Sequence, residues 1–232
     1  MKIFAIILSA ITYVMLSSCS AKQQENKIED GSIATNSVNT SEEVVDAIAE
    51  GPISDKTLDI IDSLIADLNY DGVEDLAMIT HSEGSEYNNL QISFGHSDGT
   101  MSLERNVSEM LMASDEYINY SYYLSINSGG SLVISCSEFA SAGSYDSGTY
   151  SQVYRYIDDD FYLIGQSIDA FSRSTGDGTK YSYNYRSHKM SRTTYNVFDE
   201  SVGKKTKWYD LPNRPLARLG ELSLLDMPEG IE

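Results

Sequence analysis

Short segments of apolar or alternating residues, separated by turn residues, recur along the chain from about residue 60 onward. Residues 90–94 alternate apolar and polar side chains with a period of two, which is typical of a half-buried β-strand. Residues 117–126 and 132–136 flank the sequence Asn-Ser-Gly-Gly, which is typical of a hairpin turn. The expected strands are 76–80, 90–94, 101–103, 117–126, 132–136, 150–157, 161–165, 180–186 and 190–197. Their near-regular spacing predicts an all-β fold built as an antiparallel meander or sandwich.

Two apolar segments are ambiguous. Residues 58–68 fit a helical period and a strand period about equally well, and residues 216–225 fit a short helix or a last strand. The 17 tyrosines and only 4 prolines of the chain favour sheet over a linker-like, unfolded chain.

The charge balance restricts the partners of the chain. The 232 residues carry 16 Lys plus Arg against 35 Asp plus Glu, a formal net charge of −19. Nucleic-acid binding needs a basic surface for the phosphates, so we expect no nucleic-acid partner.

The N-terminus is typical of an export signal. Lys2 precedes an apolar run over residues 3–16, which is too short to span a bilayer comfortably and suits a signal-peptide core. The run ends in Leu16-Ser17-Ser18-Cys19, which resembles the lipobox of bacterial lipoproteins. The resemblance implies that residues 1–18 are removed and that Cys19 is acylated, which anchors the protein to the lipid membrane of the cell envelope. Ser20, directly after Cys19, resembles the outer-membrane sorting pattern of Gram-negative lipoproteins. The alternative to a lipobox is an ordinary signal peptide that happens to be followed by a Cys.

Composition then suggests the organisation of the remaining chain. Residues 19–52 are mostly polar and predict a flexible tether. Within it, Thr40 and Glu43 fit a capping box, so a short helix over residues 41–50 is expected, ended by Gly51-Pro52. Residues 53–232 form the expected all-β domain.

The most specific motif is an acidic loop. Asp67, Asn69, Asp71 and Asp75 stand at loop positions 1, 3, 5 and 9, with Gly72 at position 6 for a sharp turn. Calcium is bound by six to eight oxygen ligands, and alternate residues of a tight loop can supply them. The carbonyl of Val73, at position 7, is the usual backbone ligand. An EF-hand needs Glu at position 12, where this chain has Met78, so Asp75 would have to coordinate directly. The alternative is a solvated acidic turn with Asx hydrogen bonds.

This loop variant resembles the FG-GAP (VCBS-like) repeat of integrin-α-type β-propellers. Residues 66–79 match its first half, and Phe94-Gly95 followed by Ser97-Asp98-Gly99 matches its close. The resemblance covers about residues 60–105 and implies structural Ca²⁺ bound by Asp67, Asn69, Asp71, the Val73 carbonyl and Asp75. A propeller needs several hundred residues and repeated loops, so we expect one repeat within a smaller assembly of sheets, a sandwich or an incomplete propeller.

No catalytic set stands out. Cys136 alternates with Leu132 and Ile134, so we expect a buried thiol rather than a nucleophile. The residues His81, His96 and His188 do not have zinc-ligand spacing. Residues 95–99 match Gly-x-Ser-x-Gly, but strands on both sides do not fit a hydrolase elbow, and residues 158–160 are expected to form a hairpin turn.

Three Tyr-rich segments carry two interpretations. Tyrosines at alternate positions in 117–123, 150–162 and 181–185 either pack across strands with their hydroxyls in water, or form an aromatic platform for a glycan or protein.

These features together predict a lipid-anchored, calcium-stabilised binding or structural protein of the cell envelope, on the outer membrane if the source is Gram-negative. We expect binding rather than catalysis. Two alternatives from other classes are an envelope hydrolase acting on glycan or peptidoglycan, and a periplasmic inhibitor or immunity-type protein whose acidity suits a basic partner.

Overall fold

The described residues form two antiparallel β-sheets. The computed structural model describes residues 58–141 and 146–227. Within these residues the helical structure is limited to one 3-10 turn, Glu200–Val202. The predicted signal peptide, Cys19, the tether and the helix over 41–50 lie outside the described residues.

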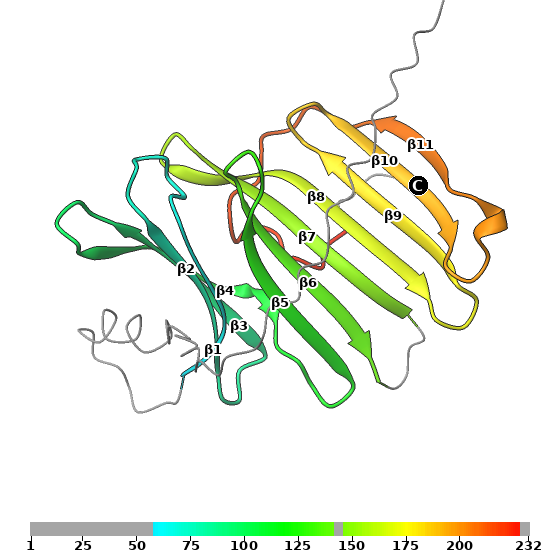
Figure 1. The fold of residues 1–232 in the computed structure, drawn as a ribbon, viewed down its shortest axis with the longest axis horizontal. Helices are drawn as coiled ribbons and strands as arrows, with labels where there is room; N and C mark the ends of the chain where they lie inside the picture. The colour runs from blue at the N-terminus through cyan, green and yellow to red at the C-terminus, as the bar shows by residue number, and fades with distance from the viewer. Residues whose placement is uncertain (1–57, 142–145, 228–232) are drawn as a thin grey trace, which may run out of the picture. The chain divides into compact units, whose positions relative to one another are not determined.

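Consecutive strands are neighbours throughout both sheets (Figure 1). The four-stranded sheet has the order β1-β2-β3-β4 and the seven-stranded sheet the order β11-β10-β9-β8-β7-β6-β5. The small sheet comprises β1 (Leu58–Ala66), β2 (Asp75–Ser82), β3 (Tyr87–Gly95) and β4 (Met101–Met112). The large sheet comprises β5 (Ile118–Ile126), β6 (Leu132–Ala140), β7 (Asp146–Ile157), β8 (Asp160–Ser172), β9 (Asp177–Asn184), β10 (Lys189–Asn196) and β11 (Lys205–Asp210). The predicted all-β antiparallel meander is therefore confirmed.

Alternation along the strands explains which face of the large sheet is buried. On β6, Leu132, Ile134 and Cys136 are almost fully buried, whereas the residues between them are partly exposed. The register places Ile134 beside Leu124 on β5 and Gln152 on β7. One face therefore forms a continuous inner surface, as a period of two requires.

The structure decides one open segment, corrects the expectation for another and contains one strand that was not expected. The ambiguous segment 58–68 is strand β1, followed by a loop. The tail over 216–225 is neither a helix nor a strand, and its only ladder pairing among the described residues is an isolated bridge between Tyr162 and Arg218. Strand β11 was not expected, because its sequence Lys-Thr-Lys-Trp-Tyr-Asp is charged and mostly exposed and lacks an apolar alternation.

The hydrophobic core lies between the two sheets. Its members are Leu68, Ala77, Ile79, Leu90, Ile92, Phe94, Met110 and Leu111 from the β1–β4 part, Tyr122, Leu124, Leu132, Ile134, Cys136, Tyr154, Phe161 and Leu163 from the large sheet, and Leu219 and Leu224 from the C-terminal segment. Burial of a Leu or Ile side chain stabilises the fold by about 1.5–3 kcal/mol, more than most single polar contacts. The core is therefore the main force that joins the sheets. In the described part of the chain, no helix reaches the length and apolar character needed to cross a membrane.

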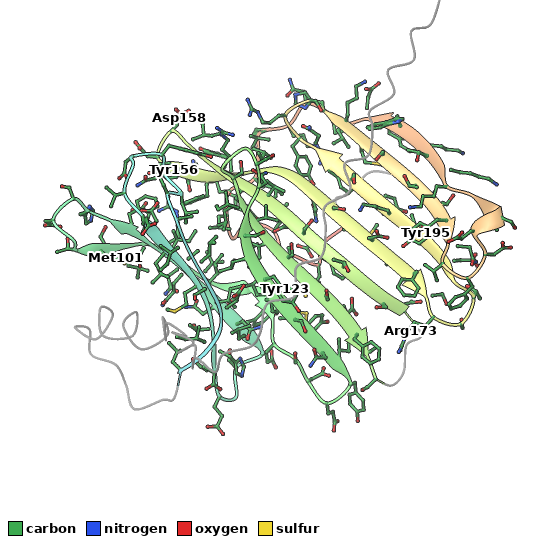
Figure 2. All side chains as sticks on the ribbon, viewed as in Figure 1. Met101, Tyr123, Tyr156, Asp158, Arg173 and Tyr195 are labelled. Atoms are coloured by element: carbon green, nitrogen blue, oxygen red, sulfur yellow. The ribbon has the colours of Figure 1, made fainter. Side chains whose placement is uncertain are left out.

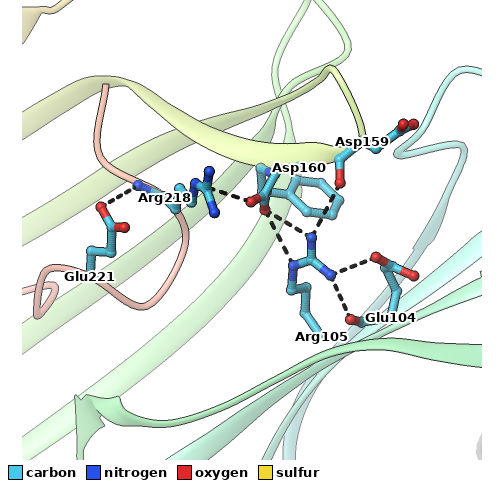
Figure 3. A network of polar contacts seen from close by, with 7 residues as sticks. Glu104, Arg105, Asp159, Asp160, Arg218 and Glu221 are labelled. Atoms are coloured by element: carbon cyan, nitrogen blue, oxygen red, sulfur yellow. Dashed lines mark hydrogen bonds and ion pairs between the residues drawn. The ribbon is translucent and has the colours of Figure 1, made fainter. Parts of the chain in front are cut away.

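A polar network adds a second connection between the sheets (Figure 3). Arg105 on β4 donates from Nη2 to Oδ1 of Asp160 on β8 at 2.9 Å, and to the carbonyl of Asp159 at 3.3 Å. Arg218 of the C-terminal segment lies 3.4 Å from the other oxygen of Asp160. One carboxylate thus contacts two arginines from separate parts of the chain.

These contacts change the titration of Asp160. Burial alone would raise the pKa of Asp160, but the hydrogen bonds from Arg105 and the Phe161 N–H, with the charges of both arginines, hold that pKa below its usual value. A lowered pKa in the folded state means that the stabilisation is present at neutral pH. It is lost as the pH falls through the folded-state pKa.

We predict that Asp160→Asn lowers the free energy of unfolding by about 1–3 kcal/mol at pH 7, because both arginines lose a charged partner. For a chain of this size the expected fall in Tm is roughly 2–12 °C, measured by thermal denaturation. Asp159→Asn is the matched control, since the Asp159 side chain makes no hydrogen bond or ion pair within the described residues and Asn tolerates its positive φ of 64°. Equal losses in the two variants would contradict a structural role for the Asp160 carboxylate.

Candidate functional site

The acidic loop connects β1 to β2 and reverses the chain within a few residues. Tyr70 and Gly72 have positive φ values of 66° and 88°. The left-handed backbone at Gly72 is the conformation that glycine at loop position 6 was expected to allow. The loop therefore has the sharp turn that was expected from its spacing.

Side-chain oxygens of the loop accept backbone hydrogen bonds from within the loop. The two carboxylate oxygens of Asp67 accept the N–H groups of Asp71 and Gly72, at 3.2 and 3.0 Å. Asn69 Oδ1 also accepts the Asp71 N–H, at 3.0 Å, and Asp71 Oδ1 accepts the Val73 N–H, at 2.8 Å. These are the bonds of the alternative, an Asx-type acidic turn. They also hold Asp67, Asn69 and Asp71 on a single turn, and an accepting oxygen keeps a second lone pair for a cation.

The charges of this turn have no cationic partner in the described part of the chain. The ion pairs of the described residues involve neither Asp67 nor Asp71. Asn69 Nδ2 donates to Asp71 Oδ2 at 3.1 Å, which is the main polar compensation that this carboxylate receives from a side chain. The net charge of the loop therefore remains exposed to any ion in solution.

Asp75 has a different environment from the other loop acids. Its side chain is fully buried and accepts three backbone N–H groups, those of Leu68 and Asn69 on Oδ2 and that of Gly95 on Oδ1, at 2.8–3.2 Å. Burial raises the pKa of Asp75, and the three hydrogen bonds oppose that rise. Asp75 thus links both ends of the loop to the end of β3 through bonds that need no ion.

Gly95 explains the Phe-Gly close of the motif. A Cβ atom built on Gly95 would lie 2.2 Å from the carbonyl oxygen of Glu74. Only glycine allows the end of β3 to approach the loop backbone so closely, which also brings its N–H to Asp75.

The five predicted calcium ligands are therefore divided. Asp67, Asn69 and Asp71 lie together on the exposed turn, Val73 donates its N–H to Asp71, and Asp75 turns into the protein. Among the described residues, no group of three or more His, Cys, Asp and Glu side chains forms a metal-binding arrangement. To bind an ion, the loop would have to bring these oxygens closer together. Asp75 would then have to coordinate the ion while it also accepts hydrogen bonds from three backbone N–H groups.

Tyr70 at the tip of the loop reaches the other sheet. Its hydroxyl donates to the carbonyl of Gly130 in the β5–β6 turn at 2.8 Å. The guanidinium of Arg155 on β7 lies 5.1 Å from the centre of the Tyr70 ring and also donates to the Gly129 carbonyl. This contact could not be predicted from the sequence, because an aromatic residue in an acidic loop does not by itself indicate what it touches.

The other candidate residues do not assemble into a second site. Cys136 is buried, and burial raises the pKa of its thiol to about 12, so it is not a thiolate nucleophile. His81 bonds to Asn88, whereas His96 bonds to Ser102. The Gly-x-Ser-x-Gly sequence forms the turn between β3 and β4 rather than a strand-to-helix elbow.

Most tyrosines of the three clusters pack on the inner face of the large sheet. Tyr122 and Tyr154 are almost fully buried, and their hydroxyls donate to Met112 O and Gln152 Oε1 rather than to water. Tyr123, labelled in Figure 2, lies on the opposite face and is 56% exposed. Cross-strand packing therefore accounts for the inner-face tyrosines, and the platform remains an expectation for the outer face alone.

We predict that Asp75→Asn lowers the free energy of unfolding by about 1–3 kcal/mol even in chelator, because one buried N–H group loses its acceptor. Thermal or urea denaturation in EDTA measures this loss. Asp59→Asn on the exposed part of β1 is the control and should be nearly neutral. If Asp75→Asn were destabilising only when calcium is present, the role assigned to the three N–H bonds would be wrong.

Searches of protein-family models, curated proteins and solved structures found no match to this chain. The resemblance to the FG-GAP repeat therefore rests on the loop motif and on Phe94-Gly95, and it stays a prediction.

Proposed function

We propose that this chain is a lipid-anchored, calcium-stabilised protein of the bacterial cell envelope that binds a partner or has a structural role. The anchor is Cys19, acylated after removal of residues 1–18. The calcium ligands are Asp67, Asn69, Asp71 and the Val73 carbonyl. Asp75 is the fifth ligand and keeps its hydrogen bonds to the backbone. An ion bound there would stiffen the loop.

One observation carries the calcium part of the proposal: two carboxylates and an amide oxygen share one exposed turn without a cationic partner in the described part of the chain. Crowded carboxylates repel one another, and a hard cation with oxygen ligands relieves that repulsion. Because Tyr70 ties the same turn to the β5–β6 turn, the ion would also stabilise the junction of the two sheets.

A binding role agrees better with the carboxyl groups than hydrolysis does. A hydrolase acid needs a raised pKa and contact with substrate. Asp75 has the raised pKa, but it is fully buried and bonded to three backbone groups. A buried carboxyl group that is bonded to three backbone groups cannot contact a substrate, so Asp75 does not support the hydrolase alternative.

We predict that calcium at ten times its Kd stabilises the protein by about 1.4 kcal/mol, a rise in Tm of roughly 3–6 °C that magnesium does not reproduce. Asp71→Asn should abolish this rise because it removes a loop charge and a ligand oxygen. In chelator the same variant should be as stable as the unsubstituted protein, or more stable, since repulsion falls. Thermal denaturation in calcium, magnesium and EDTA measures all three.

Glu74→Gln is the matched control for Asp71→Asn, because Glu74 is an exposed acid of the same loop at position 8, which supplies no ligand. It should keep the calcium response. Identical Tm values with millimolar calcium and with EDTA would contradict the calcium site and leave an acidic turn.

We predict that Cys19→Ala abolishes lipidation when the full chain is expressed in a bacterial host. Metabolic labelling with a palmitate analogue, followed by membrane fractionation, measures this. Cys136→Ala should retain the label, because that thiol is buried in the folded domain. Labelling that persists in Cys19→Ala would overturn the lipid anchor.

A further inference from the structure

The described C-terminal segment, residues 211–227, crosses the inner face of the large sheet without forming a strand. It is held at both ends and in the middle, so it forms a fixed wall rather than a loose tail. The hydrogen bonds that hold it to the sheet are Leu211 N–H to His188 O, Leu163 N–H to Ala217 O, Leu219 N–H to Phe161 O, and Gln166 Nε2–H to Asp226 O, at 2.8–2.9 Å.

A cavity of about 560 Å³ lies between this segment and the sheet. This is within the range of about 300–1,000 Å³ that is usual for small-molecule sites. Its walls are mainly apolar, with Leu163 from β8, Leu222 and Met227 from the C-terminal segment, and two prolines, Pro212 and Pro215. Such a lining suits a hydrocarbon or aromatic body.

The polar groups of the cavity favour an anion. Arg214 and His188 line it, and neither side chain makes a hydrogen bond or ion pair with another described residue. The acid of the lining, Asp226, has one carboxylate oxygen occupied by the Ser223 N–H at 2.9 Å. The remaining polar group, the Tyr185 hydroxyl, donates to Gln166.

The backbone of His188 also connects the cavity to the sheet. His188 lies in the turn between β9 and β10 with a positive φ of 51°, a left-handed conformation that is uncommon for residues other than glycine but that His adopts more often than most. Its carbonyl accepts the Leu211 N–H at the start of the C-terminal segment, so the strained turn and the cavity wall are joined directly. Strained residues cluster at ligand sites because the surrounding structure holds them in place.

We propose that this cavity binds an amphipathic carboxylate, a molecule with a hydrocarbon or aryl body and one carboxylate group. The carboxylate would pair with the Arg214 guanidinium, whose planar donors match two carboxylate oxygens, and the body would lie against Leu163, Leu222 and Pro215. The proposal goes beyond the calcium-stabilised envelope role and uses none of residues 67–75.

The test is whether the full chain binds the fluorescent probe 11-(dansylamino)undecanoic acid saturably. Binding is measured from the change in probe fluorescence, in the presence of EDTA so that calcium binding does not contribute. Decanoate should displace the probe, whereas the neutral decanol should displace it at least tenfold more weakly. Arg214→Gln should weaken probe binding by about tenfold or more, since it removes a charged partner of the carboxylate.

Two variants locate the binding. Arg192→Gln removes an exposed arginine of β10 that lies over Tyr181 and does not line the cavity, so binding should be unchanged. Leu216→Trp enlarges a wall residue and should reduce binding while the Tm is retained. Equal displacement by decanoate and decanol, unchanged binding in Arg214→Gln, or unchanged binding in Leu216→Trp would each overturn the proposal. If decanoate displaces the probe and phospholipid vesicles do not, the natural ligand is a free carboxylate rather than a membrane lipid.

Discussion

A buried carboxylate that accepts three backbone N–H groups fixes the position of the acidic loop. Asp75 draws both the start of the loop and the end of β3 to one point, and Gly95 allows the close approach. An aspartate with a pKa raised by burial is costly to keep charged, so the hydrogen bonds must compensate. This arrangement places Tyr70 where it can reach the second sheet, whatever the loop binds.

The two sheets are then joined by contacts of different kinds. The apolar core supplies most of the stability, and polar contacts set the alignment. Arg105 and Asp160 connect β4 with β8, while the Asp62 carboxylate accepts the Leu124 N–H at the edge of β5. The acidic loop acts at the same junction through Tyr70. A change in the stiffness of the loop would therefore change the local stability of both sheets at this junction.

Local patterns made much of the fold predictable. The alternation of Leu132, Ile134 and Cys136 predicted a strand with one buried face, because side-chain direction on a strand depends only on neighbours in sequence. The loop acids were found for the same reason, since a turn brings residues four apart together. Strand β11 lacks such a pattern and forms because β10 offers a free edge.

Long-range contacts were beyond the sequence. Nothing local distinguishes Asp75 from Asp71, yet one is buried by β3 and the other is exposed. The cavity is likewise formed by the C-terminal segment lying on strands far earlier in the chain, so neither Arg214 nor His188 could be connected to it beforehand. Tertiary packing decides these cases, and a single sequence does not encode it in any local period.

We propose that calcium bound in the acidic loop stiffens the junction between the sheets. Amide hydrogen exchange with and without calcium tests it most directly, because it reports local opening residue by residue. With calcium bound we expect slower exchange at Asp71 and Gly72 and at Gly130 in the β5–β6 turn, with no change in the β9–β10 turn at His188. Unchanged exchange at Asp71 and Gly72 in millimolar calcium would contradict it.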